Sequence, residues 1–114
     1  MAEYCISFDG CESLAIAPEI PDSVTNIEYT FCNCEKIKTS PQIPTNVTSM
    51  SNTFYGCISL EVAPKIPDGV TYMGMTFAYC ENLKTAPEIP SGVTNMDCTF
   101  LGCINLATAP EIPS

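Results

Sequence analysis

The sequence predicts a mainly β solenoid of about five 23-residue coils, built from short parallel strands and turns. Three observations lead to this prediction. A Pro-x-Ile-Pro segment recurs at a constant interval and uses all ten prolines of the chain; it begins at Pro18, Pro41, Pro64, Pro87 and Pro110. Seven columns of small or apolar residues recur with the same period. Finally, one such unit is too short to be stable unless it stacks on its neighbours.

The repeat covers the whole chain, so residues 1–114 are predicted to form a single repeat domain. The opening Met1–Gly10 has the sequence of the tail of one more unit. The units start near Cys11, Cys34, Cys57, Cys80 and Cys103. In the second unit, the seven columns predicted to face inward are Cys34, Ile37, Ser40, Ile43, Val47, Met50 and Phe54.

Proline decides which backbone conformation the unit can take. The inward columns are three or four residues apart, a spacing that also occurs in amphipathic helices. Proline has no N–H and disfavours helix in the residue before it, so a helix through Pro-x-Ile-Pro would be broken twice. We therefore expect short strands beside the motif, around Lys84 to Ala86 and around Val93 to Met96. Turn-forming residues at Asp68-Gly69 and Ser91-Gly92 mark a corner of the coil.

Energetics explain why the unit is repeated. Seven buried side chains at roughly 1.5–3 kcal/mol each contribute about 10–20 kcal/mol to one coil. Fixing the backbone of one coil costs about 1–2 kcal/mol for every residue, which is at least as much. A coil is therefore expected to fold only on a neighbouring coil, where it also pairs its backbone.

The charge of the chain excludes several classes of partner. There are 13 acidic and 4 basic residues, with no arginine or histidine, and the net charge is −9. Nucleic acid is a poor partner because its binding depends on lysine and arginine. No apolar run reaches the roughly 20 residues that span a bilayer, so membrane insertion is not expected. The opening MAEYCISFDG lacks the basic and apolar regions of a signal peptide.

The full pattern, L-x-x-A-P-x-I-P-x-x-V-T-x-M-x-x-T-F-x-x-C, resembles that of BspA-like leucine-rich repeats, whose units look like L-x-x-I-x-I-P-x-x-V-x-x-I followed by A-F-x-x-C. The chain departs from that pattern by one residue more between Leu83 and Val93 and one fewer between Met96 and Phe100. The resemblance implies a right-handed, leucine-rich-repeat-like solenoid. It also implies a cell-surface or extracellular protein of bacterial or protozoan type with a role in adhesion.

The cysteines allow two readings, a disulfide scaffold or a ladder of reduced thiols. The five that start the units share one inward column, where a buried thiol packs as a small apolar group, and this favours the reduced ladder. Cys5, Cys32 and Cys98 lie off that column and are the candidates for reactive thiols.

Catalytic and metal chemistry find little support in the sequence. No histidine is available, and no second CxC or CxxC joins Cys32 and Cys34 to complete a set of four zinc ligands, so no metal or cofactor is predicted. Stacked Glu88 and Glu111 could hold calcium, but Lys65 interrupts their column and favours a solvated face. No nucleophile lies beside a plausible base, so the chain is predicted not to be an enzyme.

A binding surface is expected on the strand face. The residues that carry this prediction are Lys38, Thr39, Glu61, Val62, Lys84 and Thr85. The partner would be a protein or a glycan. Tyrosines at outward positions could contribute, but they do not share one column; they are Tyr29, Tyr55, Tyr72 and Tyr79. Asn46-Val47-Thr48 matches a glycosylation sequon, but Val47 is a core position and so short a match can arise by chance.

An alternative function is a structural protein that assembles head to tail into a filament. The chain is one residue short of five periods, so a second copy placed behind the first would almost continue the repeat. Core-type residues occur in both terminal units, which the sequence therefore predicts to be uncapped. The residues expected to make end-to-end contacts are Tyr4, Phe8, Leu106 and Ile112.

Overall fold

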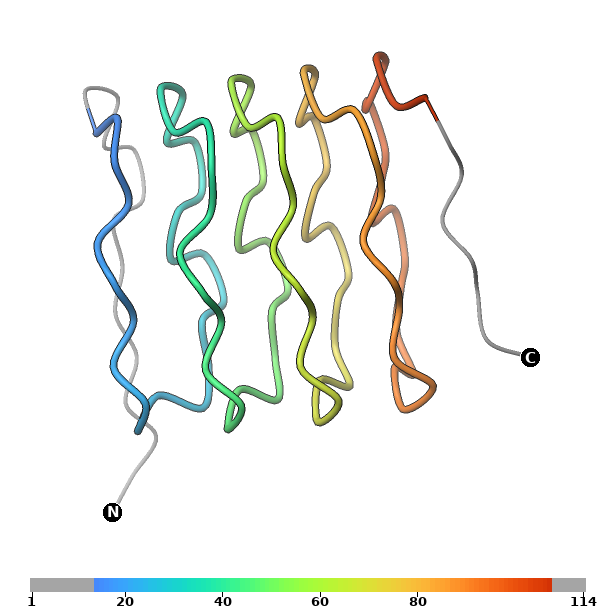
Figure 1. The fold of residues 1–114 in the computed structure, drawn as a ribbon. Coiled ribbons are helices and arrows are strands. Elements are labelled where there is room, and N and C mark those ends of the chain that lie inside the picture. The colour runs from blue at the N-terminus through green and yellow to red at the C-terminus, as the bar shows by residue number, and fades with distance from the viewer. Residues whose placement is uncertain (1–13, 108–114) are drawn as a thin grey trace.

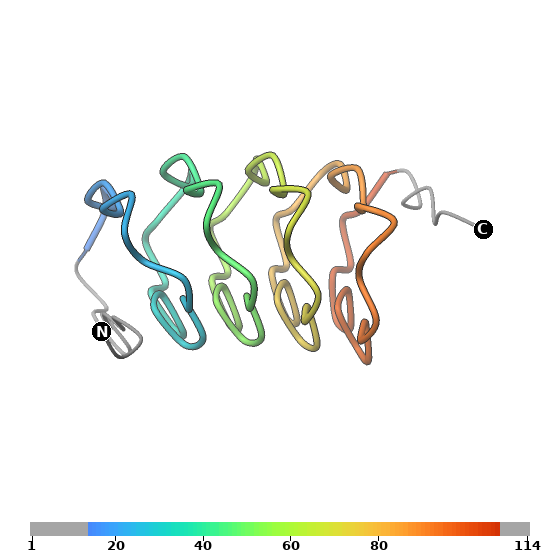
Figure 2. The same cartoon turned by 90° about the horizontal axis from the view of Figure 1, so that it is seen from below.

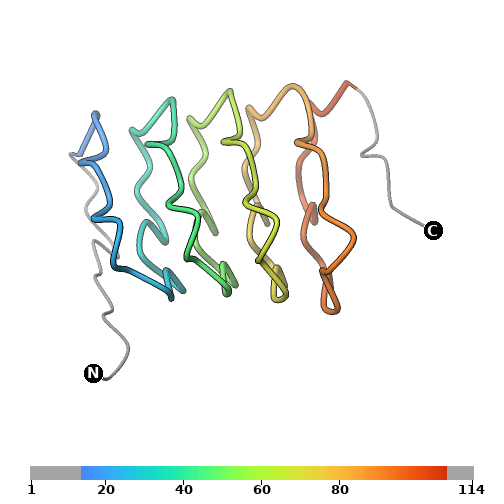
Figure 3. The ribbon, with the colours of Figure 1, turned by 60° about the horizontal axis from the view of Figure 1, so that its bottom comes forward.

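The computed structural model describes residues 14–107, which form a row of flattened coils in chain order (Figure 1). Each coil has two limbs joined by a narrow turn at either end, as the views in Figure 2 and Figure 3 also show. We call the limb that contains Pro-x-Ile-Pro the proline limb and the other the turn limb. The proline limbs are residues 14–21, 37–44, 60–67 and 83–90, and the turn limbs are residues 24–33, 47–56, 70–79 and 93–102.

Neighbouring coils pair in parallel at single residues. Within residues 14–107 there is no helix, and β pairing consists of isolated bridges that join residues one repeat apart. Asn26, Ser49, Tyr72 and Asn95 form the bridges of the turn limb, and Thr39, Val62 and Thr85 form those of the proline limb. The bridges at Thr85 and Asn95 fall inside the two ranges where strands are expected, but each strand is reduced to one residue.

On the proline limb the ladder stops because proline cannot donate. Glu61 N–H donates to the carbonyl of Lys38 at 2.9 Å, and Lys84 N–H donates to that of Glu61 at 3.4 Å. Pro64 and Pro67 follow in the third coil and have no N–H to continue the pattern. The expected strand is therefore cut to the residues that precede the motif.

On the turn limb the ladder takes a different form, in which only alternate residues pair with the next coil. In the second coil, the N–H groups of Met50, Asn52, Phe54 and Gly56 each donate to a carbonyl of the third coil at 2.8–3.0 Å. The register of these bonds is one position short of the full repeat, as in the bond from Met50 to Tyr72. The residues between them close local turns, as when Thr53 N–H donates to the Met50 carbonyl at 3.1 Å. A run of turns thus replaces the expected longer strand.

These turns require a left-handed backbone at two positions in every coil. The residues with positive φ are Tyr29, Asn33, Asn52, Gly56, Met75, Tyr79, Cys98 and Gly102. Glycine and asparagine accept this conformation readily. Gly56 and Gly102 are also in close contact with the previous coil, because a Cβ there would overlap the Asn33 side chain and the Tyr79 ring respectively. Large side chains such as Met75 adopt it at a cost, and the Met75 N–H donates to the Asp97 carbonyl of the next coil at 2.9 Å.

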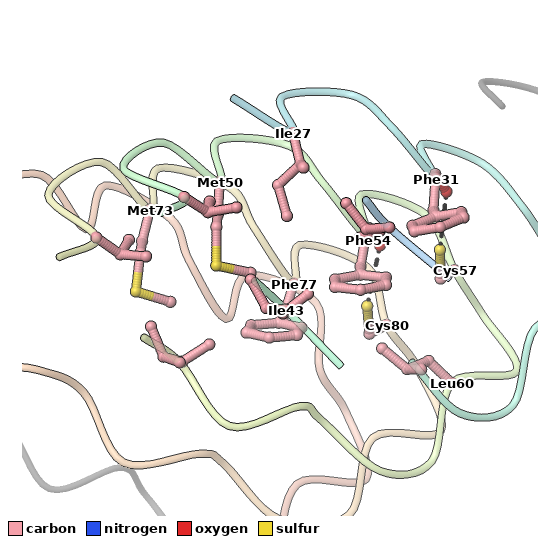
Figure 4. Packing of buried hydrophobic residues seen from close by; sticks show 14 of the residues in the cluster. Ile27, Phe31, Ile43, Met50, Phe54, Cys57, Leu60, Met73, Phe77 and Cys80 are labelled. Atoms are coloured by element: carbon pink, nitrogen blue, oxygen red, sulfur yellow. Dashed lines mark hydrogen bonds between the residues drawn. The ribbon is translucent and has the colours of Figure 1, made fainter. Parts of the chain in front are cut away.

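The core lies between the two limbs and repeats from coil to coil (Figure 4). Six of the seven predicted columns are buried in the second coil, whereas Ser40 is only half-buried and its hydroxyl donates to the Pro41 carbonyl. The phenylalanines stack in sequence, with ring centroids 5.6 Å apart for Phe31 and Phe54 and 5.7 Å apart for Phe54 and Phe77. Such offset contacts add to the apolar burial that holds adjacent coils together.

A buried threonine ladder accompanies the phenylalanines, and the sequence analysis did not identify it. Thr53, Thr76 and Thr99 are almost fully buried. The Thr76 hydroxyl lies 2.9 Å from the Met50 carbonyl oxygen and 2.8 Å from that of Met73. One hydroxyl is therefore within hydrogen-bonding distance of carbonyls in two coils. Satisfying these carbonyls avoids the cost of burying unpaired polar groups.

We predict that Phe77→Ala lowers the free energy of unfolding by about 3–5 kcal/mol, because it leaves a cavity in a fully buried stack. Lys84→Ala is the matched control and should change stability by no more than about 1 kcal/mol, since its ion pair with Glu61 is exposed. Urea unfolding of both variants measures the difference. Equal losses would show that the column of Phe77 is not the core.

Candidate binding surface

The structure brings the six predicted binding residues together on adjacent proline limbs. We call the set Lys38, Thr39, Glu61, Val62, Lys84 and Thr85 the strip. Bridges join Thr39 to Val62 and Val62 to Thr85, so the spacing across the three coils is fixed by the backbone. Val62 is 57% exposed, and the Lys84 Nζ lies 3.8 Å from Glu61 Oε1. The strip is thus a solvent-facing row with charged groups beside an apolar centre.

Basic groups gather on this side of the molecule. The four lysines are Lys36, Lys38, Lys65 and Lys84, and none belongs to a turn limb. On the proline limbs three lysines are balanced by Glu19, Glu61 and Glu88, whereas the turn limbs carry Glu28 and Asp97 and no lysine. In a chain with a net charge of −9, the strip and its surroundings are therefore the region where an acidic group of a partner meets least repulsion.

Two grooves lie between neighbouring coils at the proline limbs, and the first includes Ser40, the residue after Thr39 of the strip. Sequence reasoning did not identify them, because their shape depends on how the corners of adjacent coils sit against each other. The first, of about 390 Å³, is lined by Ser40, Pro41, Gln42, Ile43, Thr45, Pro64, Lys65, Pro67 and Asp68. The second is lined by Glu19, Ile20, Pro21, Asp22, Gln42, Pro44, Thr45 and Asn46. Both are open at the surface and could receive side chains of a partner.

The exposed tyrosines lie on the turn limbs, away from the strip. Tyr29 and Tyr72 are about half exposed. Tyr55 was expected to face outward but is partly buried, because its ring packs edge to face against that of Tyr79, with centroids 5.4 Å apart. The tyrosines and the strip therefore do not form one continuous binding surface.

The thiols of the ladder bind backbone carbonyls of the preceding coil. Cys57 Sγ donates to the Phe31 carbonyl at 3.0 Å, and Cys80 Sγ donates to that of Phe54 at 3.1 Å (Figure 4). Burial, followed by the neighbouring Cys34 thiol, raises the pKa of Cys57 to about 12, and burial also raises the pKa of Cys80. These groups stay protonated near neutral pH and act as hydrogen-bond donors in the core.

Cys32 differs from the expectation that it is reactive. It is only 6% exposed, and the Asn33 side chain donates to its Sγ at 3.6 Å. Cys98 is exposed, as expected of an off-column thiol. Cys5 and Cys11 lie outside the described residues.

The other candidate sites are placed only in part. Leu106 is half-buried on the last described coil, whereas Tyr4, Phe8, Ile112 and Glu111 lie outside the described residues. Among residues 14–107, no three Cys, Asp or Glu side chains come together as a metal site, and no helix is long and apolar enough to cross a membrane. Asn46 is exposed, and its side-chain amide donates to the Asp22 carbonyl at 3.1 Å.

The comparison with protein families identifies the repeat. The model of the BspA type leucine rich repeat region matches residues 4–113 in six copies, and the chain belongs to this family. No curated protein matches the chain.

Two solved structures resemble the chain. The crystal structure of the Treponema pallidum leucine-rich repeat protein TpLRR aligns with a TM-score of 0.76 and 25% identity, over 91% of this chain and 49% of that one. A leucine-rich repeat protein from Bacteroides ovatus aligns with a TM-score of 0.47 and 25% identity, over 93% of this chain and 39% of that one. The chain spans about half the length of TpLRR, and the first alignment supports a leucine-rich-repeat fold.

We predict that iodoacetamide at pH 8 modifies Cys98 in the folded protein, while Cys57 and Cys80 react only after unfolding, because the thiolate is the reactive form and burial disfavours it. Peptide mass spectrometry with and without denaturant gives the pattern. Disulfides joining two ladder cysteines in the natively purified protein, or equal labelling of all three, would contradict the thiol ladder.

Proposed function

We propose that the protein is a non-enzymatic interaction module of a cell-surface or secreted protein, and that the strip binds a protein partner. Membership of the BspA-type family supports the general role of a protein-interaction module. The observation that carries the assignment to the strip is the fixed row of exposed residues across three coils, centred on Val62.

The chemistry of the strip suits a protein more than a glycan. Val62 offers apolar area, and Ile16, which precedes Thr39 in the same column, is 85% exposed. Glycan sites commonly use aromatic faces, and the exposed tyrosines lie on the opposite limbs. The Lys84–Glu61 pair is solvent-exposed and contributes little to stability, so both groups can pair with a partner at small cost.

A non-enzymatic role agrees with the inventory of side chains. The chain has no histidine or arginine, and its ladder thiols are protonated donors and not nucleophiles. Adhesion at a cell surface is the form of binding that the family resemblance supports.

We predict that reversing the three charges of the strip, in the variant Lys38→Glu, Glu61→Lys, Lys84→Glu, weakens partner binding at least tenfold without unfolding the protein, since charge reversal across an interface creates repulsion. Binding is measured with surface proteins extracted from the source cells, and the retained protein is identified and then titrated in purified form.

The control is Thr48→Glu with Thr94→Glu, two exposed positions of the turn limbs that give the same net change in charge. Binding that survives reversal of the strip but is lost in the control would move the site to the turn limbs. Retention of a glycan in place of a protein would exclude a protein partner.

The second candidate function is a structural one, in which chains join end to end. The observation that favours it is the parallel pairing of residues one repeat apart, because a second copy in the same register would continue that pairing. Such a contact joins unlike surfaces and extends into a filament when it does not close.

A further inference from the structure

Pairing between the proline limbs of the second and third coils ends before the Pro-x-Ile-Pro motif. The Glu61 N–H donates to the Lys38 carbonyl, one repeat earlier, at 2.9 Å. Continued in the same register, the Lys65 N–H would meet the Gln42 carbonyl. No described residue accepts a hydrogen bond from that N–H or donates one to that carbonyl. The ladder therefore leaves an unused donor and an unused acceptor on neighbouring limbs.

Both of these residues line the first groove. This groove, of about 390 Å³, lies between the two limbs where their ladder has stopped, and its lining includes Gln42 and Lys65. Backbone groups without a protein partner bond to water or to a ligand. A ligand that replaces the missing hydrogen bond has to offer one acceptor and one donor. The main chain of an extended peptide offers both, a carbonyl and an N–H group.

The side chains of the groove favour an acidic peptide with apolar residues. Lys65 is exposed and forms no ion pair with any described residue, even though Asp68 lines the same groove. Its ammonium group is therefore available to a carboxylate of the ligand. Pro41 and Pro64 add apolar area to the groove. Its lining has no aromatic ring on which a sugar could stack.

The second groove has the same gap in its backbone pairing but a different charge. Within the described residues, the Gln42 N–H has no acceptor and the Glu19 carbonyl, one repeat earlier, has no donor. Glu19 and Asp22 line this groove, and no lysine does. A carboxylate is repelled there, so Lys65 distinguishes the first groove from the second.

We propose that the first groove binds an extended acidic segment of the partner protein. A peptide carbonyl accepts from the Lys65 N–H, a peptide N–H donates to the Gln42 carbonyl, and an Asp or Glu of the segment pairs with the Lys65 ammonium. Ser40, at the edge of the groove, follows Thr39 of the strip, so one partner can cover both surfaces. This inference rests on the proposed function, because it takes the partner to be a protein.

A peptide array tests the chemistry of the ligand. Fluorescently labelled full-length chain is applied to immobilised synthetic nonapeptides in matched sets, whose members differ only in having Asp, Asn or Lys at one position. The Asp members should be retained, and the corresponding Lys members should bind at least tenfold more weakly. Retention of no peptide, or preferential retention of the Lys members, would overturn the proposal.

A charge variant locates the bound peptide. Lys65→Glu should weaken binding of the best Asp peptide at least tenfold, because the ion pair is replaced by repulsion. Lys36→Glu is the matched control, since Lys36 is exposed, makes the same change in net charge and lies outside both grooves. It should change the affinity less than twofold. Equal effects of the two variants would refute the assignment to the groove.

The unchanged chain allows an independent test of the backbone contacts. On titration with the best Asp peptide, the NMR amide signal of Lys65 should shift more than that of Glu61, which already donates to Lys38. Methylation of each peptide nitrogen in turn should reveal one position where binding falls about fivefold, the effect of one lost hydrogen bond. An unmoved Lys65 signal, or no sensitive nitrogen, would contradict the proposed pairing.

Charge reversal of the strip separates this proposal from the proposed function. The strip variant should still bind the Asp peptide, because Lys65 is unchanged. Loss of peptide binding in the strip variant but not in Lys65→Glu would overturn the groove assignment and leave the strip as the site. Peptide binding that depends on Lys65, with partner binding insensitive to reversal of the strip, would support the groove and overturn the strip.

Discussion

The hydrogen bonds between the turn limbs of successive coils are the interaction on which the rest of the structure depends. Each coil is too small to bury its own side chains, so it needs a neighbour at a fixed distance and register. Pairing at alternate residues, as in Phe54 with Thr76, supplies that register while the intervening residues close turns. The proline limb contributes fewer bonds, since Pro64 and Pro67 interrupt its ladder. The strip lies at the residues of this limb that still pair with the next coil, so the stacking of the coils fixes the spacing between its side chains.

Polar side chains complete this pairing from inside the core. Thr76 and Cys80 each reach a carbonyl of the preceding coil that would otherwise be buried with one partner fewer. The consequence is a signature, Thr-Phe-x-x-Cys, in which the hydroxyl and thiol are selected by backbone acceptors and the ring by stacking. The same requirement explains how Cys57 and Cys80 can lie buried as free thiols in neighbouring coils.

The period of the sequence predicted the solenoid and the buried columns because a strict repeat places Phe54 and Cys57 in the same environment as Phe77 and Cys80. It did not predict the tandem turns. Glycine and asparagine signal a left-handed residue at Gly56 and Asn52, but Met75 and Tyr79 occupy the same columns and conceal it. Cys32 was misjudged for a related reason, since inward and outward positions do not alternate simply through such turns. The six strip residues were found together on one row, whereas the grooves depend on contacts between coils that no single repeat encodes.

The central claim is that alternate residues of the turn limb pair with carbonyls of the following coil, and NMR scalar couplings across hydrogen bonds measure this directly. The structure predicts a coupling between the amide nitrogen of Phe54 and the carbonyl carbon of Thr76, and between those of Met50 and Tyr72. It predicts none from the amide of Thr53 to the following coil, since that amide closes a turn on Met50. A coupling pattern in which consecutive residues pair with the next coil, as in an ordinary parallel strand, would contradict the account.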